Sequence, residues 1–219
     1  MKDEEEGMAT NAEQPDQLAR VARPVDGAAF DVVAMAASAG GIGALGVVLA
    51  GLPANFPASI VVVQHLDPRH RSLMAEILRR KTVLTVEQAR EGEHMARGTV
   101  YIAPPDRHLL VTPDGSLSLT QSELVHFVRP SADLLFESVA ASYKDRAIAV
   151  VLTGTGSDGS MGVGAIKKMG GTVIAQDRQS AEFPGMPMAA EHTGNVDFTL
   201  PLGEIAPALV ALVIKGVVE

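Results

Sequence analysis

Residues 32–41 read VVAMAASAGG, a short apolar run followed at once by small residues. Residues 60–65, IVVVQH, contain a second unbroken apolar run rich in β-branched side chains, and residues 147–152, AIAVVL, form a third. Such runs are typical of strands buried on both faces of a parallel sheet. Helical patterns follow the first run at residues 42–52 and the third at residues 162–169. The order strand, helix, strand predicts an α/β fold built on a doubly wound, mainly parallel sheet with helices on both faces.

The remaining segments extend this pattern. Further strands are predicted at residues 83–86 and 172–175, and further helices at 72–80, 131–143 and 202–213. The middle of the chain differs, because two apolar runs, 100–103 and 108–111, are separated only by Pro104-Pro105-Asp106 and Arg107, and a turn sequence follows at 113–116. These two runs are predicted to pair with each other in a small antiparallel excursion from the main sheet.

The beginning of the chain has a different composition. Residues 1–28 are polar, include the acidic run Asp3-Glu4-Glu5-Glu6, and contain Pro15 and Pro24. A segment of this kind buries too little apolar surface to offset the entropy lost on ordering, so a disordered acidic leader is predicted. Residues 29–219 are long enough for one domain with a substantial core.

Composition excludes several classes of function. The formal net charge of −8 and the 4% aromatic content argue against binding to nucleic acid. The chain has no cysteine, which excludes disulfides and thiol chemistry and suits a cytoplasmic protein. No apolar run reaches the ~20 residues of a membrane span, and no histidine spacing indicates a metal site. Neither a metal nor an organic cofactor is expected.

Three chemically competent side chains each follow a predicted strand: Ser38, His65 and Asp158. Taken singly, these would be a helix cap, a structural hydrogen-bond partner and a turn residue. The carboxyl ends of parallel strands share one edge of a sheet, however, and ligands bind there. The three residues are therefore predicted to meet as a catalytic triad.

These residue types fit acyl transfer. The imidazole of His65 can take the proton of the Ser38 hydroxyl as that oxygen attacks a carbonyl, and Asp158 can fix the imidazole tautomer and stabilise the imidazolium. Small residues after the serine, Ala39 and Gly40, let backbone N–H groups at a helix start approach an oxyanion.

A rival motif overlaps this loop. Residues 41–46, GIGALG, match the G-x-G-x-x-G pattern of dinucleotide-binding domains, with Asp67 about 20 residues further on. The match is imperfect, since Gly41 lies several residues beyond the strand and Gln64 and His65 stand where the ribose-binding acid would end the second strand. The dinucleotide-binding reading stays an alternative.

An ordered set of motifs resembles the catalytic domain of the CheB-type chemotaxis methylesterases over residues 31–213. The motifs are ASAGG at 37–41, QH at 64–65, YIAP at 101–104, RPSAD at 129–133, LTGTGSDG at 152–159 and GMP at 185–187. The resemblance implies a Rossmann-like three-layer α/β/α domain. It implies hydrolysis of glutamate γ-methyl esters on the cytoplasmic helices of chemoreceptors, and in some members deamidation of receptor glutamines. It places Ser38, His65 and Asp158 on the family's triad, Thr155 in the loop that helps the oxyanion and Met186 at the substrate site.

The sequence departs from the family pattern at three points. Ala39 stands where threonine is common, and Thr155 stands where methionine is common. The short leader also cannot hold the receiver domain that family members often carry, so a stand-alone catalytic domain is expected. A separate regulatory protein is then a candidate for its control. The other alternative is a catalytically silent interaction module of the same fold.

Overall fold

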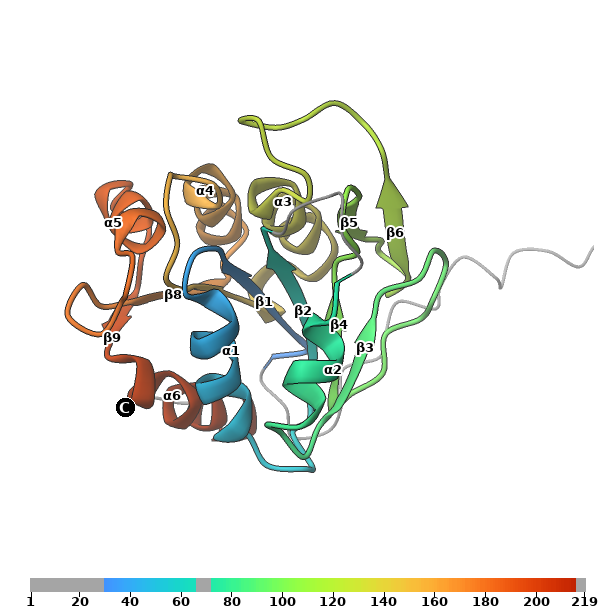
Figure 1. Ribbon diagram of the computed structural model, residues 1–219, viewed down its shortest axis with the longest axis horizontal. Coiled ribbons are helices and arrows are strands. Elements are labelled where there is room, and N and C mark those ends of the chain that lie inside the picture. The colour runs from blue at the N-terminus through green and yellow to red at the C-terminus, as the bar shows by residue number, and fades with distance from the viewer. Residues whose placement is uncertain (1–29, 66–71, 216–219) are drawn as a thin grey trace, which may run out of the picture.

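The computed structural model describes residues 30–65 and 72–215, and Figure 1 shows a central sheet between two layers of helices. The main sheet has seven strands, all parallel, in the order β3-β4-β2-β1-β7-β8-β9. Their bounds are β1 Val32–Ala37, β2 Ser59–Gln64, β3 Thr85–Gln88, β4 Thr99–Ile102, β7 Ala147–Val151, β8 Thr172–Gln176 and β9 Phe198–Leu200. A separate antiparallel pair joins β5 (His108–Val111) to β6 (Leu117–Thr120). The predicted leader lies outside the described residues.

Helices cover both faces of the sheet. They are α1 Gly41–Ala50, α2 Met74–Arg79, α3 Ala132–Tyr143, α4 Ser160–Lys168, α5 Gly185–His192 and α6 Leu202–Lys215, with a short 3-10 turn, η1, at Lys144–Arg146. One apolar cluster joins the sheet to α1, α2 and α6, and the other joins it to α3, α4, α5 and the β5-β6 pair. The predicted three-layer, doubly wound α/β fold is confirmed.

Strand β1 shows why these residues form a central strand. All six of its side chains are buried. Val33, Met35 and Ala37 enter the cluster with α1, while Val32, Ala34 and Ala36 enter the cluster on the opposite face. Apolar residues at every position therefore suit a strand that packs on both sides.

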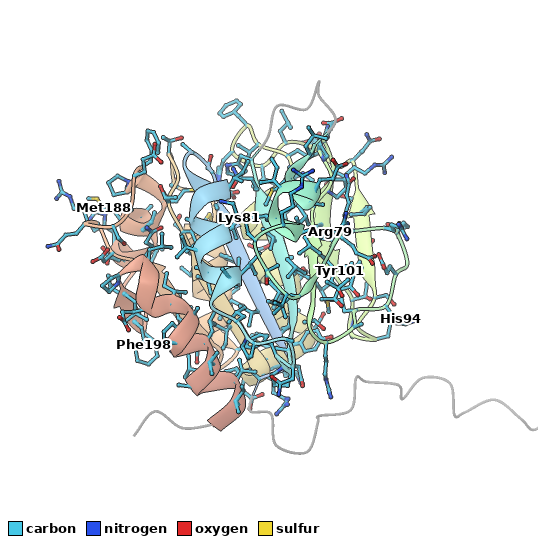
Figure 2. The ribbon with its side chains drawn as sticks, turned by 60° about the horizontal axis from the view of Figure 1, so that its bottom comes forward. Arg79, Lys81, His94, Tyr101, Met188 and Phe198 are labelled. Atoms are coloured by element: carbon cyan, nitrogen blue, oxygen red, sulfur yellow. The ribbon has the colours of Figure 1, made fainter. Side chains whose placement is uncertain are left out.

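The side chain of Lys81 packs against α1 at Gly46. A Cβ added at Gly46 of α1 would lie 2.7 Å from Cδ of Lys81, so the lysine stem covers this part of the helix. Lys81 is labelled in Figure 2, beside the ribbon of α1.

The order in which strands are added to the sheet switches sides at β1. From β1 it goes to β2 on one side, and it later returns to form β7 on the other side. Such a switch point leaves a crevice at the carboxyl ends of the strands, where α/β proteins bind ligands. The described residues that directly follow β1, β2 and β7, among them Ser38 and His65, lie at this edge of the sheet.

The predicted pairing of residues 100–103 with 108–111 is wrong. Residues 99–102 form β4, which lies between β2 and β3 in the parallel sheet, and β5 pairs with β6 across the turn predicted at 113–116. The physical reason is burial: all four residues of β4 are buried, and a two-stranded excursion could not cover both of its faces.

The other predicted elements are present with shifted ends. The strand expected at 83–86 runs from Thr85 to Gln88, and Val83 is 71% exposed. Helix α5 and strand β9 were not predicted. Helix α5 begins with Gly185 and has Pro187 in its first turn, where a missing N–H costs no helical hydrogen bond.

Candidate active site

Four hydrogen bonds hold the Asp158 carboxylate at the carboxyl edge of the sheet. Asp158 follows β7 and is only 5% exposed. Its Oδ2 accepts hydrogen bonds from His65 Nε2 at 2.8 Å and from the Ala132 N–H at 2.6 Å. Its Oδ1 accepts from the Ser131 hydroxyl at 2.9 Å and from the Asp133 N–H at 3.2 Å. The carboxylate thus binds the first turn of α3 on one side and the imidazole on the other.

These contacts set its ionisation. Burial would raise the pKa of Asp158, but the His65 hydrogen bond, the Ala132 N–H, the His65 charge and the Ser131 hydroxyl together hold this pKa below its ordinary value. Asp158 is therefore an anion that can stabilise an imidazolium.

Asp133 and Asp158 cap each other's helices. Asp158 lies two residues before α4, next to the N-cap Gly159, and accepts N–H groups from the start of α3. Asp133, in the first turn of α3, accepts the N–H groups of Met161 and Gly162 at 3.0 and 2.8 Å. Carboxylates at helix N-termini satisfy free N–H groups and the helix dipole. Moving either aspartate would therefore disturb both helix starts.

Ser38 and His65 lie on neighbouring strand ends. Ala37 of β1 pairs with Gln64 of β2, and the His65 N–H donates to the Ala37 carbonyl at 3.3 Å. Gln64 Nε2 also donates to the Ser38 carbonyl at 2.7 Å, which fixes the two loops to each other. Within residues 30–65 and 72–215 the Ser38 hydroxyl has no hydrogen bond, so the His65–Asp158 half of the predicted triad is formed and the Ser38–His65 bond is not.

The imidazole faces Asp158 through Nε2, leaving Nδ1 as the nitrogen available to a serine. Free enzymes often have long serine–histidine contacts that tighten with substrate.

Ala39 and Gly40 lead from β1 into α1. Gly40 has φ of +75°, a left-handed conformation that side chains rarely adopt, and a Cβ there would lie 2.8 Å from Glu182 Oε2. Among the described residues, the N–H groups of Ala39 and Gly40 have no acceptor. Two N–H groups are therefore available at a helix start, directly after Ser38.

Thr155 and Met186 belong to one assembly opposite Ser38. Gly154 donates its N–H to the Phe183 carbonyl at 2.8 Å and accepts from the Met186 N–H at 2.9 Å. A Cβ on Gly154 would lie 2.3 Å from Met186 Sδ and 2.8 Å from Ser38 Cβ. Met186 is buried, whereas Thr155 is exposed on the loop beyond Gly154. The structure thus brings Met186 next to Ser38 and leaves Thr155 at the surface of the same loop.

Three residues at the site were not predicted individually. Ser131 and Asp133 appeared only within the RPSAD motif, and buried His108, which accepts the Ser131 N–H, was assigned only to a strand. The signal for Ser131 was its position before an apolar helical pattern, which is typical of an N-terminal cap.

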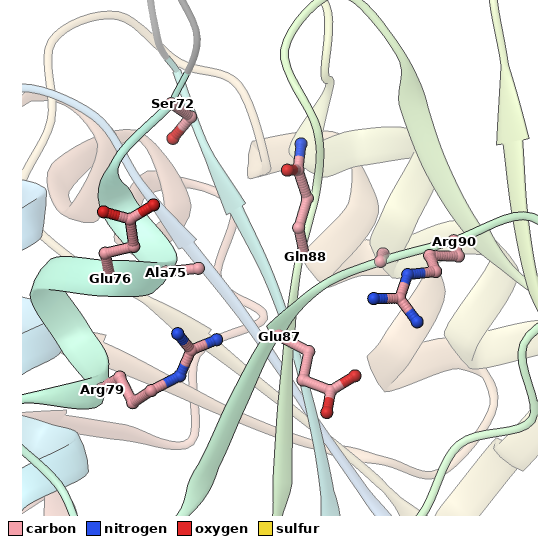
Figure 3. A pocket seen from close by; sticks show the side chains of 8 residues that line it. Ser72, Ala75, Glu76, Arg79, Glu87, Gln88 and Arg90 are labelled. Atoms are coloured by element: carbon pink, nitrogen blue, oxygen red, sulfur yellow. The ribbon is translucent and has the colours of Figure 1, made fainter.

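A polar pocket of about 410 Å³ lies beside α2 and β3, and none of the predicted site residues lines it. Figure 3 shows Arg79 reaching from α2 toward β3, where its Nε and Nη2 donate to the Val86 carbonyl at 3.2 and 2.7 Å. This arginine ties the helix to the strand.

The surroundings of Gly41, the first glycine of the GIGALG motif, argue against the dinucleotide-binding alternative. A Cβ on Gly41 would lie 2.1 Å from Gln64 Oε1, so the close approach at Gly41 is occupied by the protein's own side chain. Asp67 lies outside the described residues.

The fold and the edge arrangement define an α/β protein with a serine, a histidine and an aspartate at the carboxyl ends of its three central strands, the set used by serine hydrolases. The model of the CheB methylesterase family matches residues 33–209. The chain belongs to the CheB methylesterase family.

Relatives cover most of the chain. A Leptospira interrogans protein is 39% identical over 84% of this chain and 95% of its own length. A Burkholderia lata protein named protein-glutamate methylesterase/protein-glutamine glutaminase 1 is 43% identical over 83% of this chain, which spans 54% of that relative. The crystal structure of the Thermotoga maritima CheB methylesterase catalytic domain matches with a TM-score of 0.81 and 39% identity, over 84% of this chain and 98% of that one. No helix in the described part of the chain is long and apolar enough to cross a membrane.

Proposed function

We propose that the protein hydrolyses glutamate γ-methyl esters on the cytoplasmic helices of chemoreceptors, releasing methanol, and that it can also deamidate receptor glutamines. The observation that carries the proposal is the 2.8 Å hydrogen bond between His65 and the buried, anionic Asp158. His65 follows β2, whose end lies next to the end of β1, where Ser38 stands. The names of the relatives support the same substrate class. Because those receptor helices are cytoplasmic, we propose that the protein acts in the cytoplasm.

In the proposed mechanism, the Ser38 hydroxyl oxygen attacks the ester carbonyl and His65 Nδ1 takes its proton. Asp158 holds the Nε2 proton and stabilises the resulting imidazolium. The N–H groups of Ala39 and Gly40, with the Thr155 loop, are positioned to stabilise the oxyanion. The Nδ1 proton then passes to the departing methanol oxygen, and a water molecule frees the acyl group in a second, equivalent cycle.

Exposed apolar side chains beside the site support a protein substrate. Leu124, Phe127 and Met161, here called the apolar rim, are 54%, 94% and 64% exposed. His126 Nδ1 lies 3.6 Å from Asp133 Oδ2, and Asp133 accepts the Met161 N–H, so the rim adjoins the Asp158 network. Exposed apolar side chains beside a polar site suit contact with another protein.

The decisive experiment measures methanol release from methylated receptor by wild type and Ser38→Ala. We expect the variant to lose on the order of 10⁴- to 10⁶-fold in kcat. The matched control is Ser142→Ala, whose hydroxyl donates to the Val111 carbonyl on the hairpin side of α3. Near-wild-type release by Ser38→Ala would rule out the proposal.

Among residues 30–65 and 72–215 the Ser38 hydroxyl has no hydrogen-bond partner, and this observation favours the alternative, a catalytically silent module. A serine-directed phosphonylating probe separates the two functions. Added mass at Ser38, absent in His65→Ala, is expected of the esterase; no labelling of the folded protein would favour the silent module.

A further inference from the structure

A chain of hydrogen bonds leads from Asp158 into the interior of the protein. The Ser131 hydroxyl donates to Asp158 Oδ1 at 2.9 Å, and the Ser131 N–H donates to His108 Nδ1 at 3.1 Å. His108 Nε2 in turn lies 3.0 Å from the Glu123 carbonyl oxygen. His108 is the first residue of β5 and is completely buried.

The partners of His108 define its tautomer. Nδ1 faces an N–H donor and must accept, while Nε2 faces a carbonyl oxygen and must donate. Only the imidazole with its proton on Nε2 satisfies both contacts. A buried polar group without a partner is costly, so this arrangement strongly favours one ring orientation.

We propose that His108 is a positioning residue for Asp158, acting through Ser131 and the first turn of α3. This inference rests on the proposed esterase function. The bond from the Ser131 N–H holds the residue that caps α3 in an extended conformation, with φ of −109° and ψ of 133°. That residue directs three donors at Asp158: its own hydroxyl and the N–H groups of Ala132 and Asp133. His108 thereby sets the place of the carboxylate that holds His65.

Two substitutions of His108 test the role of the Nδ1 acceptor separately from that of the Nε2 donor. His108→Asn keeps an oxygen where Nδ1 stands and can still accept the Ser131 N–H. His108→Gln keeps a donor near Nε2 but has no acceptor at the δ position. We expect His108→Gln to lower kcat on the order of 10²-fold, as a misplacement of about 1 Å does, with KM for methylated receptor unchanged. His108→Asn should keep most of kcat.

Whether His108 acts through Asp158 is tested by adding His108→Gln to the Asp158→Ala variant. His108→Gln should cost nothing further in kcat when added to Asp158→Ala, because the group that it positions is gone. Equal losses in both backgrounds, or equal losses for the Asn and Gln variants, would overturn the proposal. His94→Gln, a change at an exposed histidine bonded to Ser116, is the control and should match wild type.

A measurement on the unmodified chain needs no variant to fold. In ¹⁵N-labelled protein, His108 should carry its proton on Nε2, and a proton on Nδ1 would overturn the proposal. If the wild-type chain releases no methanol, the proposed function fails while the tautomer still tests the geometry. If wild type is active and His108→Gln is equally active, only the positioning role fails.

Discussion

Asp133 and Asp158 are both aspartates and belong to one hydrogen-bond network, yet their pKa values are shifted in opposite directions. Burial, together with the charge of Asp158, raises the pKa of Asp133 despite the Gly162 and Met161 N–H groups and His126. For Asp158 the same burial is outweighed by His65 and the start of α3, and its pKa falls. The difference arises because Asp158 has a direct hydrogen bond to an imidazole at 2.8 Å, whereas the histidine near Asp133 lies 3.6 Å away.

Acid stability should separate the two residues. A lowered folded pKa adds stability above the ordinary value of 3.8 that is lost as pH falls through the folded pKa, so Asp158→Asn should flatten the decline between about pH 5 and pH 2. A raised pKa acts oppositely: its stability is present below 3.8 and lost as pH rises. Asp133→Asn should therefore steepen the gain in unfolding free energy from about pH 4 to pH 6. Urea titrations across this range check both, and parallel curves for the two variants would contradict the assignment.

Catalysis gives a second test of Asp158. Asp158→Asn should lower kcat roughly 10⁴-fold, because an amide can hold the wrong imidazole tautomer and cannot stabilise the imidazolium. Methanol release measures this effect, with circular dichroism as the control for folding. A loss confined to KM would contradict the role proposed for the carboxylate.

At the scale of elements, the start of α1 depends on one glycine. Gly40→Ala should lower the free energy of unfolding by about 1–2 kcal/mol, because alanine is strained at φ of +75°. Gly43→Ala, three residues later in the helix with nothing within 4 Å of the added Cβ, should instead stabilise by about 0.5–1 kcal/mol. Urea unfolding of the pair measures both; a Gly40→Ala protein as stable as Gly43→Ala would contradict the strain.

The same scale shows what sequence patterns could and could not predict. Strands β1, β2 and β7 were predictable because unbroken apolar runs mark strands buried on both faces. Strand β4 was assigned to the wrong neighbour because its distant partners, β2 and β3, leave no mark within residues 99–111. The His65–Asp158 contact followed from shared strand ends, whereas the His108–Ser131 bond depends on how the β5-β6 pair packs against α3, which local patterns do not contain.

At the scale of the whole molecule, the carboxyl edge of the sheet carries both the reacting groups and the apolar rim. Phe127→Ser should raise KM for methylated receptor about 10-fold or more, since burying a large apolar side chain contributes about 1.5–3 kcal/mol. Labelling of Ser38 by a small phosphonate should be unchanged. Val83→Ser, at a 71% exposed residue before β3 and so on the opposite edge, is the control. Equal changes in KM for both variants would contradict a role for the rim.

The strands that carry Ser38, His65 and Asp158 are β1, β2 and β7, immediate neighbours with further strands on each side. Backbone amides in such fully covered strands exchange with deuterated solvent only when the whole core opens, while borders such as β3 and β9 release theirs sooner. Local opening of the edge strands β3 and β9 should therefore leave the relative positions of Ser38, His65 and Asp158 unchanged. In partly denaturing solvent, activity should disappear together with the last protected amides of β1.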